Sequence, residues 1–158
     1  MTENSVNSPS IFVDGDACPV KDEIIRVAAR HNLQVTMVSN QGLRASVGPN
    51  IKAILVGPEF DAADNWIAEN CRPHDIVITA DIQLAARCLK QGAQVIGHNG
   101  KPFTPDNIGR ALASRELNQY LRESGEISGN NKTFSKKDRA SFLQTLENVT
   151  QKILREMT

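Results

Sequence analysis

A chain of 158 residues with 40% hydrophobic residues and only 4% aromatic ones can bury an aliphatic core in one domain without disulfides or a structural metal. Its 18 basic and 18 acidic residues cancel, which excludes a global field that would attract a polyanion, so nucleic-acid binding would need a local patch. Three widely spaced cysteines and the lack of a long apolar run argue against a disulfide framework and a membrane span. We therefore expect a cytoplasmic protein with no membrane partner.

Apolar strands alternate with helices along the first two thirds of the chain. Residues 1–9 predict a disordered lead-in, and residues 11–13 predict a buried strand that ends at Asp14. The expected elements that follow are a helix from Pro19 to about Asn32, strands at 35–38 and 51–56, a helix at 61–71, a strand at 75–79, a helix at 84–89 closed by Gly92, and a strand at 93–96. This alternation favours a three-layer α/β fold, in which helices cover both faces of a mostly parallel sheet.

The last third of the chain has a different pattern. Residues 107–122 predict a helix, and residues 124–135, rich in Gly, Ser and Asn, predict a flexible arm. Ser135 is suited to cap a last helix at 136–157, whose apolar positions recur at helical spacing, so this helix should pack on another element. The whole chain, 1–158, is thus expected to be one α/β domain with a C-terminal helical arm.

Acidic residues follow two of the expected strands. Asp14 and Asp16 come after the first strand, Asp81 comes after the fourth, and Asp64 lies at the start of a helix. Ligands of open parallel sheets bind at the carboxyl ends of the strands, and clustered carboxylates suit a hard cation such as Mg²⁺ or Mn²⁺. These four acids are therefore candidate catalytic residues around a metal, although Asp16 could instead cap the next helix.

Two further aspartates favour plainer explanations. Asp61 stands where a helix begins, a position that favours Asp as a cap, although it shares a helix face with Asp64. Asp75 starts a strand, at the end opposite the candidate site, and is expected to lie in a surface turn.

Polar residues near the acids are candidates for substrate contacts. Thr79 could orient Asp81 or a water molecule, or it could be a structural strand residue. Asn40, Gln41 and Asn65 could contact substrate, with turn and cap roles as the alternative. The remaining expectations concern residues outside the candidate site. Cys18 is expected to be a packing residue rather than a reactive thiol, Cys71 and Cys88 to belong to the core, and Trp66 to be a packing residue. The three histidines are expected on the surface: His31, His74 and His98.

One basic cluster stands at the start of the last helix and consists of Lys132, Lys136, Lys137 and Arg139. A solvated helix start is the default explanation for such a run. Because it follows the Gly- and Asn-rich arm, Lys136 and Lys137 are also candidates for contacts to an RNA phosphate backbone.

Six segments of the chain resemble the bacterial YaiI/YqxD family. They are VDGDACPV at Val13–Val20, SNQGLR at Ser39–Arg44, FDAADNWI at Phe60–Ile67, DIVITADIQLA at Asp75–Ala85, NIGRALASRE at Asn107–Glu116 and KKDRASF at Lys136–Phe142. The resemblance implies a relative of the PIN domain, a compact α/β nuclease fold with an acidic metal site. It implies Asp14, Asp64 and Asp81 as the metal ligands and Asp16 as an additional acid. The arm departs from the family's usual Gly-Gly-Pro and reads Ser-Gly-Asn-Asn-Lys at 128–132.

Three functions are compatible with these residues. The leading hypothesis is hydrolysis of phosphodiester bonds, in RNA, by a Mg²⁺ or Mn²⁺ ion that activates water and stabilises the leaving oxygen. A second is an aspartyl phosphatase of haloacid-dehalogenase type, with Asp14 as nucleophile and Asp16 as acid/base. That chemistry also needs a later lysine and an acidic pair, and this sequence has no well-placed lysine and no Asp-Asp pair after Asp81. The third is a non-catalytic module that binds RNA or another partner.

Overall fold

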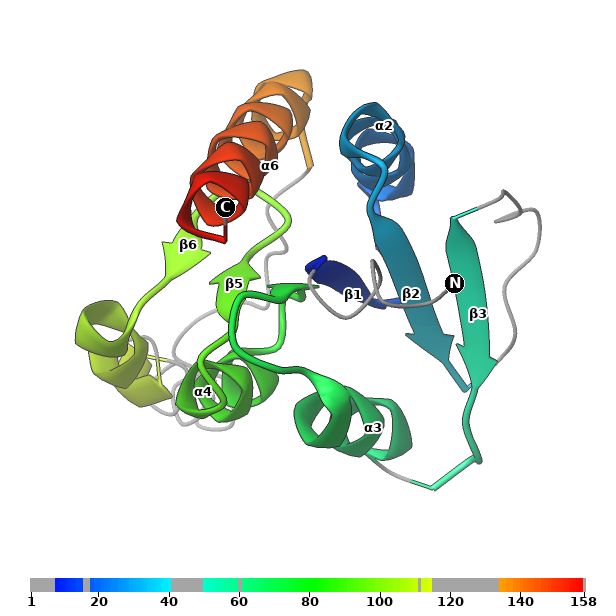
Figure 1. The fold of residues 1–158 in the computed structure, drawn as a ribbon. Helices are drawn as coiled ribbons and strands as arrows, with labels where there is room; N and C mark the ends of the chain where they lie inside the picture. Colours follow the sequence, from blue (N-terminus) through cyan, green and yellow to red (C-terminus); the bar gives the residue numbers. More distant parts are fainter. Residues whose placement is uncertain are drawn as a thin grey trace.

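A six-stranded sheet forms the middle layer of the protein, as the computed structural model shows (Figure 1). The structure describes residues 8–15, 18–40, 50–59, 61–110, 112–114 and 134–157. The strand order is β3-β2-β1-β4-β5-β6, in which the first five strands are parallel and β6 is antiparallel to β5. The strands are β1 (Ser10–Asp14), β2 (Gln34–Ser39), β3 (Ile51–Leu55), β4 (Ile76–Ile78), β5 (Gln94–Ile96) and β6 (Pro102–Phe103).

The strand order reverses at β1, which pairs with β2 on one side and with β4 on the other. The chain first moves outward from β1 to β3 and then returns to the other side of β1. Such a reversal opens a crevice at the carboxyl ends of the two central strands, where α/β proteins bind ligands. The topology therefore marks the ends of β1 and β4 as the place to look for a site.

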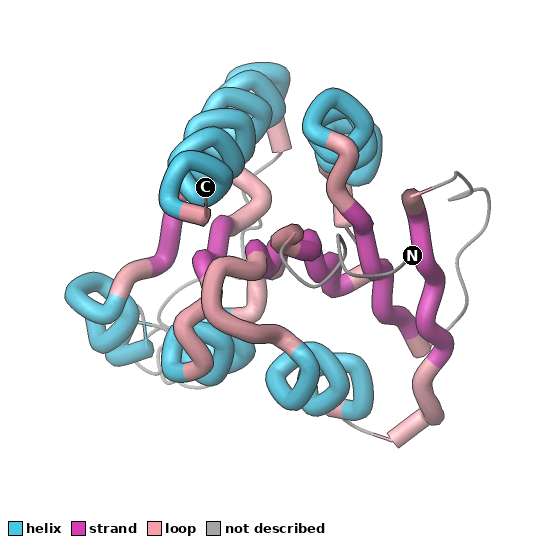
Figure 2. The backbone as a smooth tube through the Cα atoms, in the orientation of Figure 1, coloured by secondary structure: helices cyan, strands magenta, loops and turns pink. Residues whose placement is uncertain are grey.

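Helices cover both faces of the sheet (Figures 1 and 2). One face carries α2 (Lys21–His31) and α6 (Lys136–Glu156), and the other carries α3 (Ala62–Asn70) and α4 (Ile82–Lys90), with further helical residues at 105–110 and 112–114. Side chains along β1 point alternately to the two faces of the sheet. Ile11 and Val13 therefore pack with α2 and α6, whereas Phe12 packs with α3 and α4. The expected three-layer α/β architecture is confirmed.

Local signals in the sequence explain several helix ends. Asn32 ends α2 in the left-handed conformation, at φ 57°, and Gly92 does the same after α4, at φ 87°. At the start of α6, Ser135 and Asp138 form a reciprocal capping box, in which each side chain accepts a hydrogen bond from the other residue's backbone N–H.

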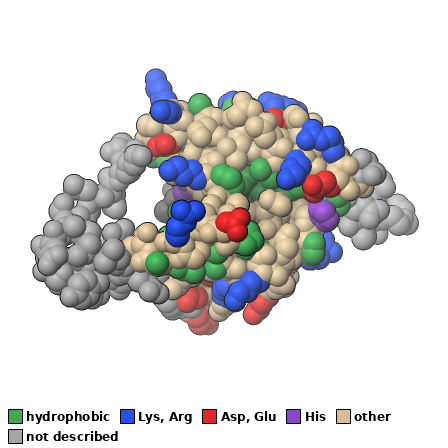
Figure 3. Space-filling view, turned by 90° about the vertical axis from the view of Figure 1, so that its left-hand side faces the viewer, with side chains coloured by type: hydrophobic (Ala, Val, Ile, Leu, Met, Phe, Trp, Pro, Cys, Tyr) green, Lys and Arg blue, Asp and Glu red, His purple; other side chains and the backbone are tan. Residues whose placement is uncertain are grey.

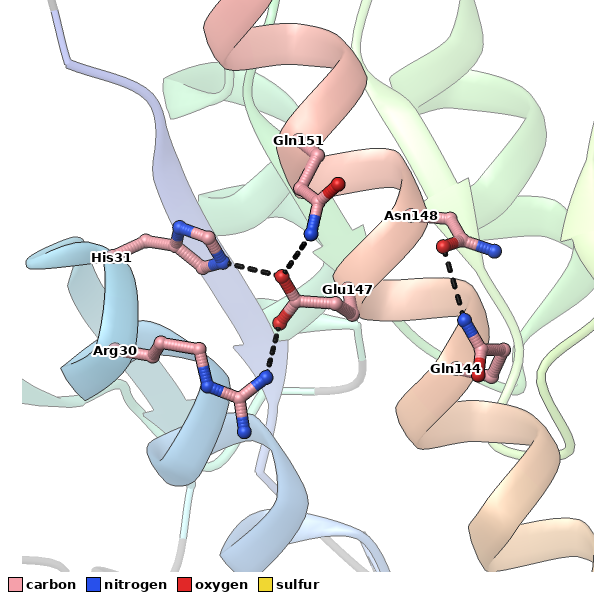
Figure 4. Close-up of polar contacts among 6 residues, drawn as sticks. All are labelled: Arg30, His31, Gln144, Glu147, Asn148 and Gln151. Carbon is pink, nitrogen blue, oxygen red and sulfur yellow. Dashed lines mark hydrogen bonds and ion pairs between the residues drawn. The ribbon is translucent and has the colours of Figure 1, made fainter.

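The C-terminal helix packs on the domain, and a polar cluster joins its middle to the end of α2 (Figure 4). The carboxylate of Glu147 contacts Arg30 at 2.7 Å and His31 at 2.7 Å, and it accepts a hydrogen bond from Gln151. Burial alone would raise the pKa of Glu147, but these hydrogen bonds and the nearby charges lower it overall. The expectation that His31 is simply a surface residue is wrong, because its side chain is only 17% exposed and is paired.

The structure departs from the expected elements at three further points. Pro19 lies in the turn before α2 rather than in its first turn. Asp75 is buried, not a surface turn, and its carboxylate accepts hydrogen bonds from the backbone N–H groups of Ser10 and Arg72. The short strand β6 was not expected at all, and its two residues carry too little pattern to predict it.

Parts of the predicted domain organisation lie outside the described residues. These are residues 1–7 of the lead-in, residues 111 and 115–122 of the helix predicted at 107–122, and residues 124–133 of the arm. Among the helices that the structure describes, none is long and apolar enough to cross a membrane.

Candidate acidic site at the carboxyl edge of the sheet

Three predicted acids meet where the strand order reverses. Asp14 is the last residue of β1, Asp81 follows the neighbouring strand β4, and Asp64 lies in the first turn of α3. The charges of both Asp81 and Asp14 act on Asp64, and that of Asp81 acts more strongly. The parallel sheet and the helix that enters its edge thus bring three carboxylates from distant parts of the chain together.

Thr79 connects two of these acids. Its buried hydroxyl donates a hydrogen bond to Asp14 Oδ2 at 3.3 Å and accepts one from the backbone N–H of Asp81 at 3.0 Å. A hydroxyl that bonds on both sides fixes the separation of the groups it joins. Thr79 is therefore placed to orient both Asp14 and the loop that carries Asp81.

Asp81 also begins α4. Its Oδ1 atom accepts hydrogen bonds from the backbone N–H groups of Gln83 at 2.9 Å and Leu84 at 3.1 Å. Such a cap satisfies donors that a helix leaves unpaired at its N-terminus. Because both cap bonds use Oδ1, the side chain is held rigidly while Oδ2 takes no part in the cap.

The pKa of Asp64 reflects how closely the acids are placed. Burial, followed by the negative charges of Asp81, Asp14 and Asp61, raises the pKa of Asp64 from its ordinary 3.8 to about 6. Desolvation and like charges both disfavour a carboxylate, so Asp64 holds its proton in mildly acidic solution. A cation placed among these groups would reverse that preference.

The donor set matches a hard cation, but a complete three-ligand site is not formed among the described residues. In that part of the chain, no three His, Cys, Asp or Glu side chains are arranged to hold a metal ion as they stand. Mg²⁺ commonly binds through one or two carboxylates and keeps several water molecules. The pair Asp64 and Asp81, beside Asp14, meets that smaller requirement, whereas Asp16 lies outside the described residues.

An open pocket of about 400 Å³ lies beside the acids, lined by Asp14, Asn40, Asp61, Asp64 and the turn before α3. Asn40 is exposed at its rim, directly after β2. Asp61 stands at the N-cap position of α3 but makes no side-chain cap hydrogen bond and adopts φ 65°. The prediction that Asp61 serves as a helix cap is therefore wrong, and its charge instead adds to the negative field on Asp64.

Asn65, another predicted polar contact, is not among the described residues that line this pocket. Asn65 Oδ1 accepts a hydrogen bond from Arg87 Nη1 at 2.8 Å, which joins α3 to α4. Gln41 lies outside the described residues.

The start of α6 lies at the same edge of the sheet as the acids. Arg139 donates a hydrogen bond to the Pro19 carbonyl at 2.7 Å, next to the start of α2, while Glu147 contacts the end of α2, so the two helices run in the same direction. Lys136 and Lys137 are exposed in this first turn of α6. Arg139 is part of the packing, since it also stacks over Phe134 at 5.0 Å, and Lys132 lies outside the described residues.

Positive charge is also present on another face of the molecule. Figure 3 shows that Lys and Arg side chains surround an apolar stretch on the side that is at the left of Figure 1. Asp and Glu side chains lie among them, so this face carries charges of both signs.

Cysteines and aromatic residues near the site have the expected packing roles. The three cysteines are free thiols; Cys71 and Cys88 are buried in the core, and burial raises the pKa of the Cys18 thiol, which makes it a poor nucleophile. Trp66 packs on Phe12, with 6.1 Å between the ring centroids.

His98 lies deeper in the protein than its sequence position predicted. It was expected on the surface, but its Nε2 atom is buried, and burial lowers its pKa. His98 follows β5, the strand beside β4, and so stands at the same edge as Asp81. The pattern that pointed to Asp14 and Asp81, a polar residue at or shortly after the end of a strand, also applies to His98, which follows β5 after Gly97.

Comparison with known proteins gives consistent matches along nearly the whole chain. The family described as "Uncharacterized BCR, YaiI/YqxD family" matches residues 12–152. A UPF0178 protein of Agrobacterium fabrum is 53% identical over 146 residues, which cover 92% of this chain and 95% of the relative. A UPF0178 protein of Parvibaculum lavamentivorans is 54% identical over 145 residues, with 92% and 95% covered, and one of Mesorhizobium japonicum is 50% identical over 151 residues, with 96% and 97% covered.

Proposed function

This chain belongs to the YaiI/YqxD family, as its motifs predicted, and we propose that it is a cytoplasmic phosphodiesterase that cleaves RNA with a Mg²⁺ or Mn²⁺ ion. The observation that carries the proposal is the crowding of Asp14, Asp64 and Asp81 at the reversal point of a parallel sheet, recorded in the pKa of about 6 at Asp64. Mutual repulsion of partly buried carboxylates destabilises the protein, and such arrangements are concentrated at functional sites.

Four residues of the site would have distinct roles toward a bound cation. Asp64 and Asp81 would hold the cation, and Asp14, directly beside them, would complete its surroundings. Thr79 would keep Asp14 and the Asp81 loop at a constant separation through the two hydrogen bonds it makes. A bound divalent cation would supply Lewis acidity, which activates a water molecule and stabilises the leaving oxygen of the phosphodiester.

Substrate binding would involve the basic residues at the start of α6, which lies at the same edge of the sheet as the acids. Lys136 and Lys137 lie in the exposed first turn of α6, near the start of α2, and could contact phosphates of a strand that crosses the acidic site. Asn40, at the rim of the acidic pocket, could donate a hydrogen bond to the same strand. These contacts fit a neutral protein that binds RNA only locally.

The experiment that tests the proposal compares three substrates under three metal conditions. RNA, single-stranded DNA and p-nitrophenyl phosphate would each be incubated with Mn²⁺, Mg²⁺ or a chelator. We expect metal-dependent cleavage of RNA, and a loss of about a hundredfold or more in Asp14→Asn. Asp22→Asn is the matched control, since Asp22 is an exposed acid in the first turn of α2.

Two outcomes would replace the proposal. Hydrolysis of the phosphomonoester through a phosphorylated Asp14 that can be trapped would identify an aspartyl phosphatase. Undiminished RNA binding by Asp14→Asn, with no cleavage by either protein under any metal condition, would identify a binding module.

A further inference from the structure

A second cavity lies at the carboxyl edge, on the side of Asp81 away from Asp64. Its volume is about 280 Å³, and it is lined by the residues on both sides of Asp81, by the turn after β5 and by the start of α6. The side chains that define it are Ile82, His98, Asn99, Phe103, Phe134 and Asp138. It therefore adjoins the acidic site, with Asp81 between the two.

The walls of this cavity are held in place from several directions. The turn after β5 is anchored to α6, because Thr145 donates a hydrogen bond to the Gly100 carbonyl at 2.8 Å. Gly100 has φ 86°, and a Cβ there would lie 2.6 Å from the backbone of Ser141, so the turn and the helix touch directly. Phe134 is fixed by the Arg139 guanidinium, which stacks on its ring. The cavity is thus formed before any ligand arrives.

Its chemistry is aromatic with a small polar component. Phe103 and Phe134 supply ring surfaces, while His98 and Asn99 supply hydrogen-bonding groups. The buried Nε2 atom of His98 has no hydrogen-bond partner among the described residues. Leaving a buried polar atom unpaired costs free energy. This atom has almost no water-accessible surface, so a ligand in the cavity would recover that cost by turning the imidazole ring toward itself. Because burial also lowers the pKa of His98, the ring is neutral at pH 7, and this nitrogen can donate or accept according to its tautomer.

We propose that this cavity is a nucleobase subsite, in which one base of the RNA strand lies against Phe103 and Phe134 and bonds through its polar edge to His98. The inference rests on the proposed function for the identity of the strand, since the adjoining acids would act on the phosphate next to that base. Aromatic side chains at a single-stranded site bind any base through its face, and polar groups then select among base edges.

Charge and size favour a base over other parts of a nucleotide. Asp138 contributes a carboxylate to the wall, which repels a phosphate but not a neutral base. A cavity of about 280 Å³ lies just below the range of about 300–1,000 Å³ that drug-sized ligands occupy, so it suits a smaller, flat ring.

The test is an equilibrium titration of the full chain, without metal and with chelator present. The probes are the four ribonucleoside 5′-monophosphates and ribose 5-phosphate, and the readout is the ¹⁵N resonance of His98 Nε2. We expect at least one nucleotide to shift this resonance and ribose 5-phosphate not to shift it. His98→Ala and Phe134→Ala should each weaken nucleotide binding about tenfold, and His98→Gln, which keeps a polar group, should recover part of the loss.

The matched control is His74→Asn, which alters an exposed histidine in a turn at the opposite edge of the sheet, where φ is 75° and asparagine is tolerated. It should leave nucleotide binding unchanged. Nucleotide binding that depends on His98 in a protein that cuts no RNA would support the subsite and contradict the nuclease. RNA cleavage without nucleotide binding at His98, or equal binding by folded His98→Ala, His98→Gln and parent proteins, would overturn the subsite alone.

Discussion

Replacing Asp64 by asparagine is expected to stabilise the protein above pH 6 and to change its stability little below the ordinary pKa of 3.8. The unfolded chain releases the Asp64 proton at about its ordinary pKa of 3.8, whereas the folded protein holds it until about 6. Between these values the folded state binds more protons than the unfolded state, so the free energy of unfolding falls as the pH rises. Asparagine cannot ionise and removes this loss.

The size of the effect follows from the pKa difference. The interval from 3.8 to about 6 corresponds to about 3 kcal/mol at about 1.4 kcal/mol per pH unit. Asp64 is partly exposed, and solvent screening reduces this to about 1–2 kcal/mol. Asparagine also loses a negative charge in the first turn of α3, which costs about 0.3–1 kcal/mol. The net gain at pH 7 should be about 0.5–1.5 kcal/mol.

Thermal unfolding at a series of pH values between about 3 and 7.5, in chelator, measures this directly. For a chain of this size about 1 kcal/mol corresponds to roughly 2–4 °C in Tm. The Tm of Asp64→Asn should exceed that of the parent protein at pH 7, and the difference should shrink through the interval from about 6 to 3.8 and vanish below it. Asp22 is an exposed acid in the first turn of α2, as Asp64 is an acid in the first turn of α3. Asp22→Asn should lower the Tm at pH 7, because it removes a favourable charge at a helix start and relieves no repulsion.

The reasoning is refuted if Asp64→Asn behaves like Asp22→Asn. A Tm below that of the parent protein at pH 7 would mean that Asp64 is ionised without penalty. The three acids would then not crowd one another, and the argument for a cation among them would fail with it.

Three other perturbations follow from the same structure. Mn²⁺ at about 100 times its Kd should add about 2.7 kcal/mol to the free energy of unfolding. Asp81→Asn should remove most of this gain, although the asparagine side-chain oxygen can still cap α4. Equal shifts in the parent protein and in Asp81→Asn would mean that the ion binds elsewhere. Glu147→Ala should cost about 1–2 kcal/mol at pH 7 in a urea titration, since it breaks the contacts between α2 and α6. Because the pKa of Glu147 is lowered in the folded state, the stabilisation is complete above its ordinary pKa of 4.5 and is lost as the pH falls through the folded value, so a cost that persists in acid would contradict this origin. Gly100→Ala should lower the free energy of unfolding by about 2 kcal/mol or more, because a Cβ there would clash with the backbone of α6. Gly109→Ala, whose Cβ would have nothing within 4 Å, should raise the free energy of unfolding by about 0.5–1 kcal/mol. Similar effects at both sites would exclude the close approach of Gly100 to α6.

Local patterns predicted the elements and the ends of the strands well. The apolar run before Asp14 became β1, Ser135 became a helix cap, and Asn32 ended α2 as expected. These outcomes depend on neighbours in sequence, where spacing and turn chemistry are informative. The two residues of β6 form a strand only because β5 offers an edge with which to pair, and no local pattern carries that information.

Environments were predicted less well than positions. Asp75 and His98 both stand at strand ends, but distant segments bury them: Ser10 donates its N–H group to Asp75, and the start of α6 lies across the cavity from His98. Asp61 occupies the expected cap position, yet its backbone conformation turns it away from that role. Which side chains are desolvated, and which charges they meet, depends on the packing of elements that are far apart in sequence.

The measurement that tests the central claim most directly is the rate of RNA cleavage as Mn²⁺ is titrated into the chelated protein, for the parent chain, Asp81→Asn and Asp22→Asn. The account predicts that the parent and Asp22→Asn gain activity together, in a saturable manner, and that Asp81→Asn loses about a hundredfold or more while remaining folded. Equal cleavage by the parent and Asp81→Asn, or cleavage that chelator does not abolish, would contradict it.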